Sequence, residues 1–139
     1  MFFMNKRLLN LRKSSKALAG LPVLSQTQIS KRWKLDPDTV RKLLRDHSIP
    51  TAPGPWKRAR YAISEIWRVE GVSAATMSDP EHHTALFEPL LTANDLAELL
   101  DCVPATVRNY ARDELLKSIR LGTTIRFRRC DVSAVQDGV

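Results

Sequence analysis

The sequence predicts a mainly α-helical fold with small β-hairpins, arranged as two tandem copies of one small domain. A ten-residue phrase occurs twice, as PDTVRKLLRD at 37–46 and as PATVRNYARD at 104–113. The match extends on both sides at an offset of 67 residues, which drops to 66 after about residue 56. Each phrase follows a helical apolar pattern and precedes an alternating, strand-type pattern. Two copies of one fold differ in this way, by a residue lost in a loop.

The charge distribution divides the chain into four parts. We predict a basic N-terminal arm at 1–20, a first copy at 21–70, an acidic linker at 71–89 and a second copy at 90–139. The net charge is +7, and the arm and the first copy supply the positive excess. Such an excess indicates a polyanionic partner, nucleic acid before a membrane surface. The arm is either a solvated tail or a basic segment that contacts the phosphates of the nucleic acid. Its apolar residues are interrupted by charges, so it is not a signal peptide.

Each copy should open with a capped helix. Ser25 is a good N-cap with Gln28 three residues later, which is a capping-box spacing. In the second copy Thr92 takes the same place, with Asp95 in the first helical turn. A tight corner follows each helix, so the two helices of a copy should pack at an angle.

The repeated phrase should be the second helix of each copy. Pro37 and Pro104 suit the first helical position, where a missing N–H costs nothing. Asp36 is a good N-cap and Val103 is a poor one, so the second copy should be weaker there by roughly 1 kcal/mol. The apolar stripe of the second phrase includes Tyr110, which we expect in the core.

The face opposite the apolar stripe is basic in both phrases. Arginines four residues apart repel on a bare helix, so their recurrence indicates a face that contacts anions. The two threonines either start the helix or contact a phosphate or base. The candidate contact residues of these helices are Thr39, Arg41, Lys42, Arg45, Thr106, Arg108, Asn109 and Arg112.

Strand patterns follow the repeated phrases. In KSIRLGTTIRFRR apolar and basic residues alternate around Gly122–Thr123, which predicts a β-hairpin with an exposed basic face. In the first copy PTAPGPWKRARYAI has three prolines, so its hairpin should be shorter and irregular. Trp56 either anchors this loop or meets a sugar edge. A short closing helix should follow each hairpin. The candidate contact residues of the hairpins are Lys57, Arg58, Arg60, Arg120, Arg126 and Arg128.

Two helices at a tight corner, a hairpin and a closing helix make a winged helix-turn-helix. In this fold each second helix would lie in a major groove, with the wings on the backbone or in the adjacent minor groove. The linker spans at most about 60 Å when extended. One chain could then cover two half-sites about 35 Å apart, one helical turn of DNA.

The second copy resembles the excisionase-like branch of the MerR winged-helix superfamily over about 45 residues. That pattern runs roughly L-T-x-x-E-x-A-x-x-L, a corner, T-V-R, and a wing that ends R-x-R/F-x-x-x-D/E-V/L. The matching positions are Leu91, Thr92, Ala97, Leu100, Thr106, Val107, Arg108, Gly122, Arg126, Asp131 and Val132. The family's usual Glu-Ala is replaced by Asp95-Leu96-Ala97, and its polar N-cap by Val103. The first copy looks like a more divergent relative that keeps Pro37, Thr39, Val40, Arg41, Arg60 and Tyr61.

The resemblance implies a small protein that binds and bends double-stranded DNA. Our leading hypothesis is a recombination directionality factor of a phage or mobile element, with an integrase or another DNA-bound protein as partner. A transcription regulator with the same DNA contacts is the alternative. A packaging or protein-interaction component is a third, because the near-neutral second copy could hold a protein. The chain would act as a monomer that mimics a dimer or as a cooperative oligomer.

No catalytic or metal-binding pattern emerges from the sequence. There is no GxGxxG, P-loop or HExxH motif, and Cys102 and Cys130 have no CxxC spacing. We therefore predict a non-enzyme without cofactor or metal. No apolar run approaches membrane-spanning length, and unpaired cysteines suit a cytoplasmic protein, associated with the nucleoid when bound to DNA.

Overall fold

The computed structural model describes residues 20–132, so the predicted N-terminal arm and residues 133–139 lie outside the described part. We call residues 21–70 the N-terminal unit and residues 90–132 the C-terminal unit. The N-terminal unit contains a helical pair and a short antiparallel sheet, followed at once by another helix. Its elements are β1 (Val23–Ser25), α2 (Gln26–Trp33), α3 (Pro37–Asp46), β2 (Arg60–Ala62) and α4 (Ile63–Val69).

The C-terminal unit also has a helical pair, and a β-hairpin follows it. Its elements are α7 (Ala93–Leu99), α8 (Pro104–Arg112), β3 (Ile119–Leu121) and β4 (Thr124–Arg126). β3 and β4 pair antiparallel, and Leu91 forms an isolated antiparallel bridge with Phe127. Residues 129–132 begin the expected closing helix.

Both helical pairs follow the same local rules. Ser25 forms the predicted capping box with Gln28, and the predicted N-cap Thr92 also forms a capping box, with Asp95. Asp36 caps α3, whereas Val103 makes no side-chain cap bond to α8, as predicted. The corner after each first helix contains a left-handed residue, Lys34 at φ 54° or Asp101 at φ 52°. Lys34 and Asp101 are as far apart in the sequence as the two repeated phrases are.

The loop after α3 differs from the predicted hairpin. The described structure has no strand between residues 47 and 59, and β2 pairs with β1, where Leu24 faces Tyr61. The prolines remove backbone donors, and the loop closes with a bond from the Ala52 N–H to the Arg60 carbonyl. Trp56 donates its Nε1–H to the Ala52 carbonyl at 3.0 Å, so it anchors this loop.

Residues 71–89, the predicted linker, are folded against α4 and are not extended. They form α5 (Ala74–Ser78), η1 (Pro80–His82) and α6 (His83–Phe87). Met77 and Leu86 are buried in one cluster with Trp67, whose Nε1–H donates to the Leu86 carbonyl at 3.1 Å.

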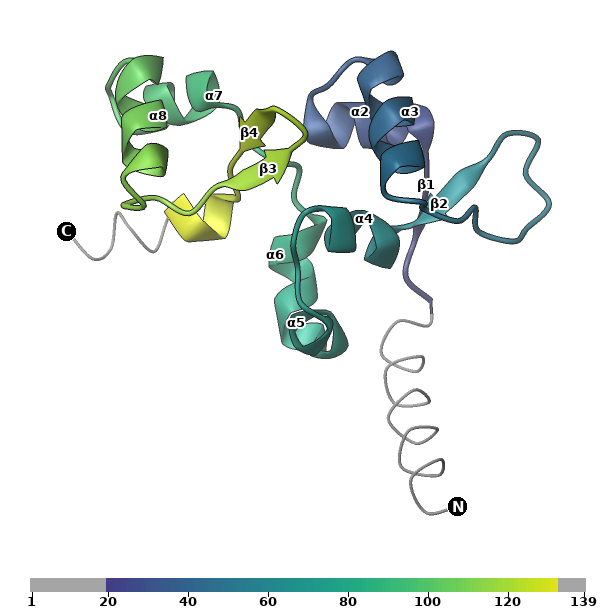
Figure 1. Cartoon of the computed structure of the whole chain (residues 1–139). Helices are drawn as coiled ribbons and strands as arrows, with labels where there is room; N and C mark the ends of the chain where they lie inside the picture. The colour runs from purple at the N-terminus through teal and green to yellow at the C-terminus, as the bar shows by residue number, and fades with distance from the viewer. Residues whose placement is uncertain (1–19, 133–139) are drawn as a thin grey trace.

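The hairpin of the C-terminal unit lies between the two helical pairs (Figure 1). One buried cluster contains Trp33, Val40 and Leu43 of the N-terminal unit together with Ile119 and Leu121 of β3. A second cluster holds the interior of the C-terminal unit, including Leu96, Val107 and Phe127. The two units therefore share apolar packing through β3.

Candidate nucleic-acid interface

The exposed face of α8 carries the polar side chains that the sequence predicted for it. Val107 is buried against α7, which turns Arg108, Asn109 and Arg112 toward solvent. Arg112 Nε lies 3.4 Å from Asp113 Oδ1, and both side chains are mostly exposed. A surface pair of this kind is worth at most about 1 kcal/mol and can give way to a phosphate.

Tyr110 is 40% exposed, so its prediction as a core residue is wrong. Within α8 only Val107 is buried, and Ala111 is half-buried against the same cluster. The apolar stripe of α8 is thus narrower than the sequence pattern suggested, which leaves the tyrosine ring at its edge. A tyrosine tolerates such a partly exposed position because its ring is apolar and its hydroxyl group is polar.

The exposed face of α3 carries Arg41, Lys42 and Arg45. Arg41 is paired with Asp38 one turn earlier, again on the surface. Thr39 donates its hydroxyl to Asp36 at 2.6 Å, and its backbone N–H donates to the same carboxylate at 3.1 Å. These bonds hold the pKa of Asp36 below its ordinary value, with the hydroxyl bond as the largest cause. Thr39 therefore serves as a helix-start residue in this structure; its counterpart Thr106 is half-buried on α8.

The loop before β2 also presents basic side chains. Lys57 and Arg58 are exposed. Arg60 is half-buried, with its guanidinium carbon 5.6 Å from the centroid of the Trp56 ring. A cation placed in this way over an indole ring is attracted by the ring electrons. The loop thus presents two exposed basic side chains, whereas the guanidinium of Arg60 lies over the Trp56 ring.

In the C-terminal hairpin only Arg120 has the exposure that the sequence predicted. The expectation that Arg126 and Arg128 lie on an exposed face is wrong. Arg126 donates Nε–H to the Trp33 carbonyl and Nη2–H to the Lys34 carbonyl, both at 2.8 Å. The last carbonyls of a helix lack intrahelical partners and form the negative end of its dipole, so the end of α2 attracts this cation. Burial lowers the pKa of Arg126, and Asp95 opposes that shift.

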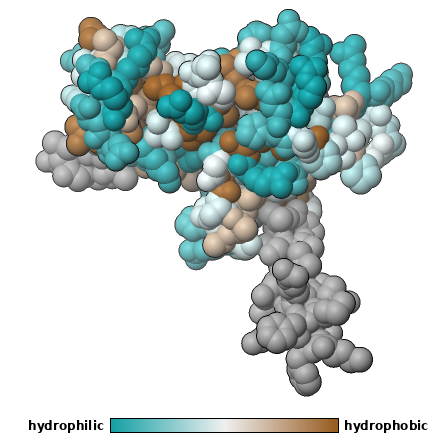
Figure 2. Space-filling model, viewed as in Figure 1, coloured by the Kyte–Doolittle hydropathy of each residue, from teal (hydrophilic) through white to brown (hydrophobic). Residues whose placement is uncertain are grey.

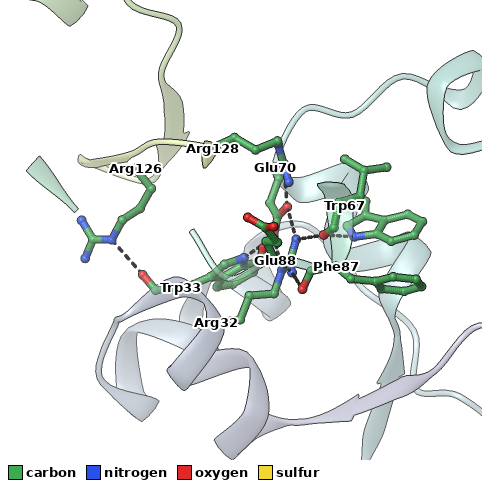
Figure 3. Close-up of polar contacts among 9 residues, drawn as sticks. Arg32, Trp33, Trp67, Glu70, Phe87, Glu88, Arg126 and Arg128 are labelled. Carbon is green, nitrogen blue, oxygen red and sulfur yellow. Dashed lines mark hydrogen bonds and ion pairs between the residues drawn. The ribbon is translucent and has the colours of Figure 1, made fainter. Parts of the chain in front are cut away.

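Arg128 is only 7% exposed and donates Nη2–H to Glu70 Oε1 at 2.9 Å. Glu70 also binds Arg32 and Trp33, and Figure 3 shows these side chains converging on its carboxylate. Sequence reasoning missed Arg32 and Glu70 as structural residues. Two signals were available in the sequence. Arg32 stands next to the core residue Trp33, and Glu70 directly follows the mainly apolar run IWRV.

Hydrophilic residues cover the parts of the surface over α8 and over α3, with apolar residues visible between them (Figure 2). Between residues 20 and 132, no group of three or more His, Cys, Asp or Glu side chains could hold a metal ion. Over the same range no helix has the length and apolar character needed to cross a bilayer.

Comparison with known proteins identifies one part of the chain. Residues 90–137 match a family model described as a helix-turn-helix domain. No curated protein and no solved structure matches the chain. The match covers α7, α8 and the hairpin, and it supports DNA as the partner. The matched range contains α7 and α8, the helical pair of the C-terminal unit, so this part of the chain is similar to a helix-turn-helix domain.

Proposed function

We propose that the chain binds a specific double-stranded DNA site through two helix-turn-helix units, the matched one and a divergent copy at residues 21–70. The observation that carries this proposal is the exposed Arg108–Asn109–Arg112 face on the second helix of the matched domain. The repeated sequence, the paired left-handed corners and the basic face of α3 support the second copy.

In this proposal α8 enters the major groove. Asn109 has the amide geometry that pairs with adenine, and the arginines can bind guanine or phosphate. α3 would contact a neighbouring stretch of DNA with Arg41, Lys42 and Arg45. Lys57, Arg58 and Arg120 are exposed cations on the loop and hairpin beside these helices, where backbone phosphates would lie.

The biological role we propose is that of an excisionase-like directionality factor that bends DNA at an attachment site. The resemblance of residues 90–132 to that branch of winged-helix proteins supports this role. An excision assay with a neighbouring integrase tests it. Unchanged excised product on adding the protein would exclude the directionality role and favour a transcription regulator.

The DNA-binding proposal is tested by titrating labelled DNA from beside the encoding gene with the full chain. Six to eight phosphate contacts predict that log affinity falls against log salt with a slope of roughly −5 to −7. Arg108→Ala with Arg112→Ala should abolish specific binding. The control is Lys31→Ala with Arg68→Ala, which removes the same charge from exposed positions on α2 and α4. Equal losses in both double variants, with unchanged helical circular dichroism, would show that α8 is not the reading helix.

A further inference from the structure

We propose that the Glu70 network, defined as Arg32, Trp33, Glu70 and Arg128, fixes the C-terminal unit on the N-terminal unit. The two basic helices α3 and α8 then form one rigid DNA-binding body that accepts a single half-site spacing. The spacing depends on the proposed function, whereas the rigidity can be measured without DNA.

The Glu70 carboxylate is fully enclosed and fully used as an acceptor. None of its side chain is exposed. Its oxygens accept bonds from Arg32 Nε at 2.7 Å and Nη2 at 2.9 Å, from Trp33 Nε1 at 2.7 Å and from Arg128 Nη2 at 2.9 Å. A carboxylate has about four acceptor positions, and these four bonds occupy them. The donors come from α2 and from the chain after β4, so a single side chain joins the two units (Figure 3).

Arg32 extends the network to the segment between the units. Its Nη2 also donates to the Leu86 carbonyl at 2.7 Å, and its Nη1 donates to the carbonyls of Phe87 and Glu88 at 3.2 and 3.1 Å. Together with the two bonds to Glu70, these three bonds use all the N–H donors of the Arg32 guanidinium. The end of α6 is thereby held against α2, which leaves little freedom to the chain that leads into the C-terminal unit.

The charges in this network are unequal. Two buried arginines face one carboxylate, and Nη1 of Arg128 is the one buried side-chain nitrogen or oxygen of residues 20–132 without a hydrogen-bond partner. Removing the carboxylate would leave two buried cations unpaired, which is strongly unfavourable. Removing Arg128 would leave the Arg32–Glu70 pair intact. Arg128 is therefore the residue whose replacement releases the C-terminal unit with the least damage to the N-terminal core.

Contacts outside the network join the same surfaces. Leu90 lies in the N-terminal core, and its N–H donates to the Arg32 carbonyl at 3.1 Å. Ile119 and Leu121 of β3 are buried in that core as well. Lys34 forms an ion pair with Asp95 of α7. Together these contacts hold the end of α2 to the second unit through apolar, backbone and charged groups.

A rigid body and a flexible pair differ in their response to half-site spacing. One inserted base pair moves the second half-site by about 3.4 Å and rotates it by roughly 35° around the duplex. A flexible tether absorbs such a change, whereas a rigid body loses one of its two contacts. Loss of simultaneous engagement costs on the order of a hundredfold in apparent affinity.

The rigidity is tested on the full chain by spin labels on exposed residues of the two helices, with Asp46→Cys and Ala105→Cys in a background of Cys102→Ser and Cys130→Ser. We expect one narrow distance distribution for the parent chain and a broad one for Arg128→Met. The matched control is Arg129→Met, because Arg129 is its exposed neighbour. Glu70→Gln should broaden the distribution too, and if it fails to fold, Arg128→Met decides. A broad parent distribution, or an unchanged one in Arg128→Met, would overturn the inference.

The spacing is tested by footprinting the bound site and then inserting one to five base pairs between the half-sites. The parent chain should lose affinity about a hundredfold, whereas Arg128→Met should lose less than about tenfold. Equal losses in the two proteins would overturn the spacing rule. Absence of any specific footprint would refute the proposed function, while the spin-label result would still decide the rigidity.

Discussion

Leu121→Ala should destabilise the N-terminal unit, although Leu121 lies in the hairpin of the C-terminal unit. Leu121 is 1% exposed and belongs to the cluster of Trp33, Val40 and Leu43. Truncation removes apolar contacts from that cluster and leaves a cavity between β3 and α3.

The expected loss follows from the complete burial of this side chain. Leu→Ala substitutions at buried sites cost about 2–5 kcal/mol of unfolding free energy. With a urea dependence of about 1.5 kcal/mol/M for a chain of this size, a loss of about 3 kcal/mol lowers the unfolding midpoint by about 2 M.

The assay uses tryptophan fluorescence during urea unfolding. All three tryptophans lie between residues 33 and 67, so their emission reports on the N-terminal unit. Leu115→Ala is the control, because Leu115 is 65% exposed and its truncation should change stability by less than about 0.5 kcal/mol. An unmoved fluorescence midpoint in Leu121→Ala, with helical signal lost elsewhere, would refute the shared core.

Two further predictions concern individual contacts. The pKa of Asp95 is held below its ordinary value of 3.8, chiefly by the hydrogen bond from Lys34 and then by the Thr92 N–H. A lowered pKa stabilises the fold above pH 3.8, and that contribution is lost as pH falls through the folded-state pKa. Asp95→Asn should therefore be less stable than the parent by about 1 kcal/mol at neutral pH, and the difference should shrink as the pH falls below 3.8, as measured by urea unfolding at each pH. Val103→Ser should raise the unfolding free energy by about 1 kcal/mol, measured by circular dichroism, because it supplies the missing cap of α8.

Each of these predictions has its own contradicting outcome. A difference between Asp95→Asn and the parent that persists unchanged at pH 2 would show that the carboxylate charge is not the cause. Val103→Ala is the control for the cap, since it removes the same apolar surface without adding an acceptor. Equal stability of the serine and alanine variants would show that no cap bond forms.

The sequence predicted those features that depend on neighbours along the chain. Caps at Ser25, Asp36 and Thr92 and the proline starts of α3 and α8 are decided within four residues, and the structure contains each of them. The helix-turn-helix assignment of the second copy depends on the same local signals and agrees with the family match.

The sequence misplaced those features that depend on contacts between distant segments. Alternation in KSIRLGTTIRFRR separates the two faces of the hairpin, but it does not say what covers either face. The supposed open face meets the N-terminal unit, where Arg126 bonds to the end of α2 and Arg128 bonds to Glu70 after α4. The short helices α5 and α6 were missed for a similar reason. Five-residue helices are unstable alone, and these depend on packing against Trp67.

The position of β3 has a consequence for biosynthesis. A ribosome releases the N-terminal helices long before residue 121, so the nascent chain must carry an incomplete apolar surface around Trp33 until the hairpin emerges. The N-terminal unit thus acquires its full stability only after the hairpin at residues 119–126 has left the ribosome. A chain truncated before the hairpin should aggregate or require a chaperone, although every residue of its own two helices is present.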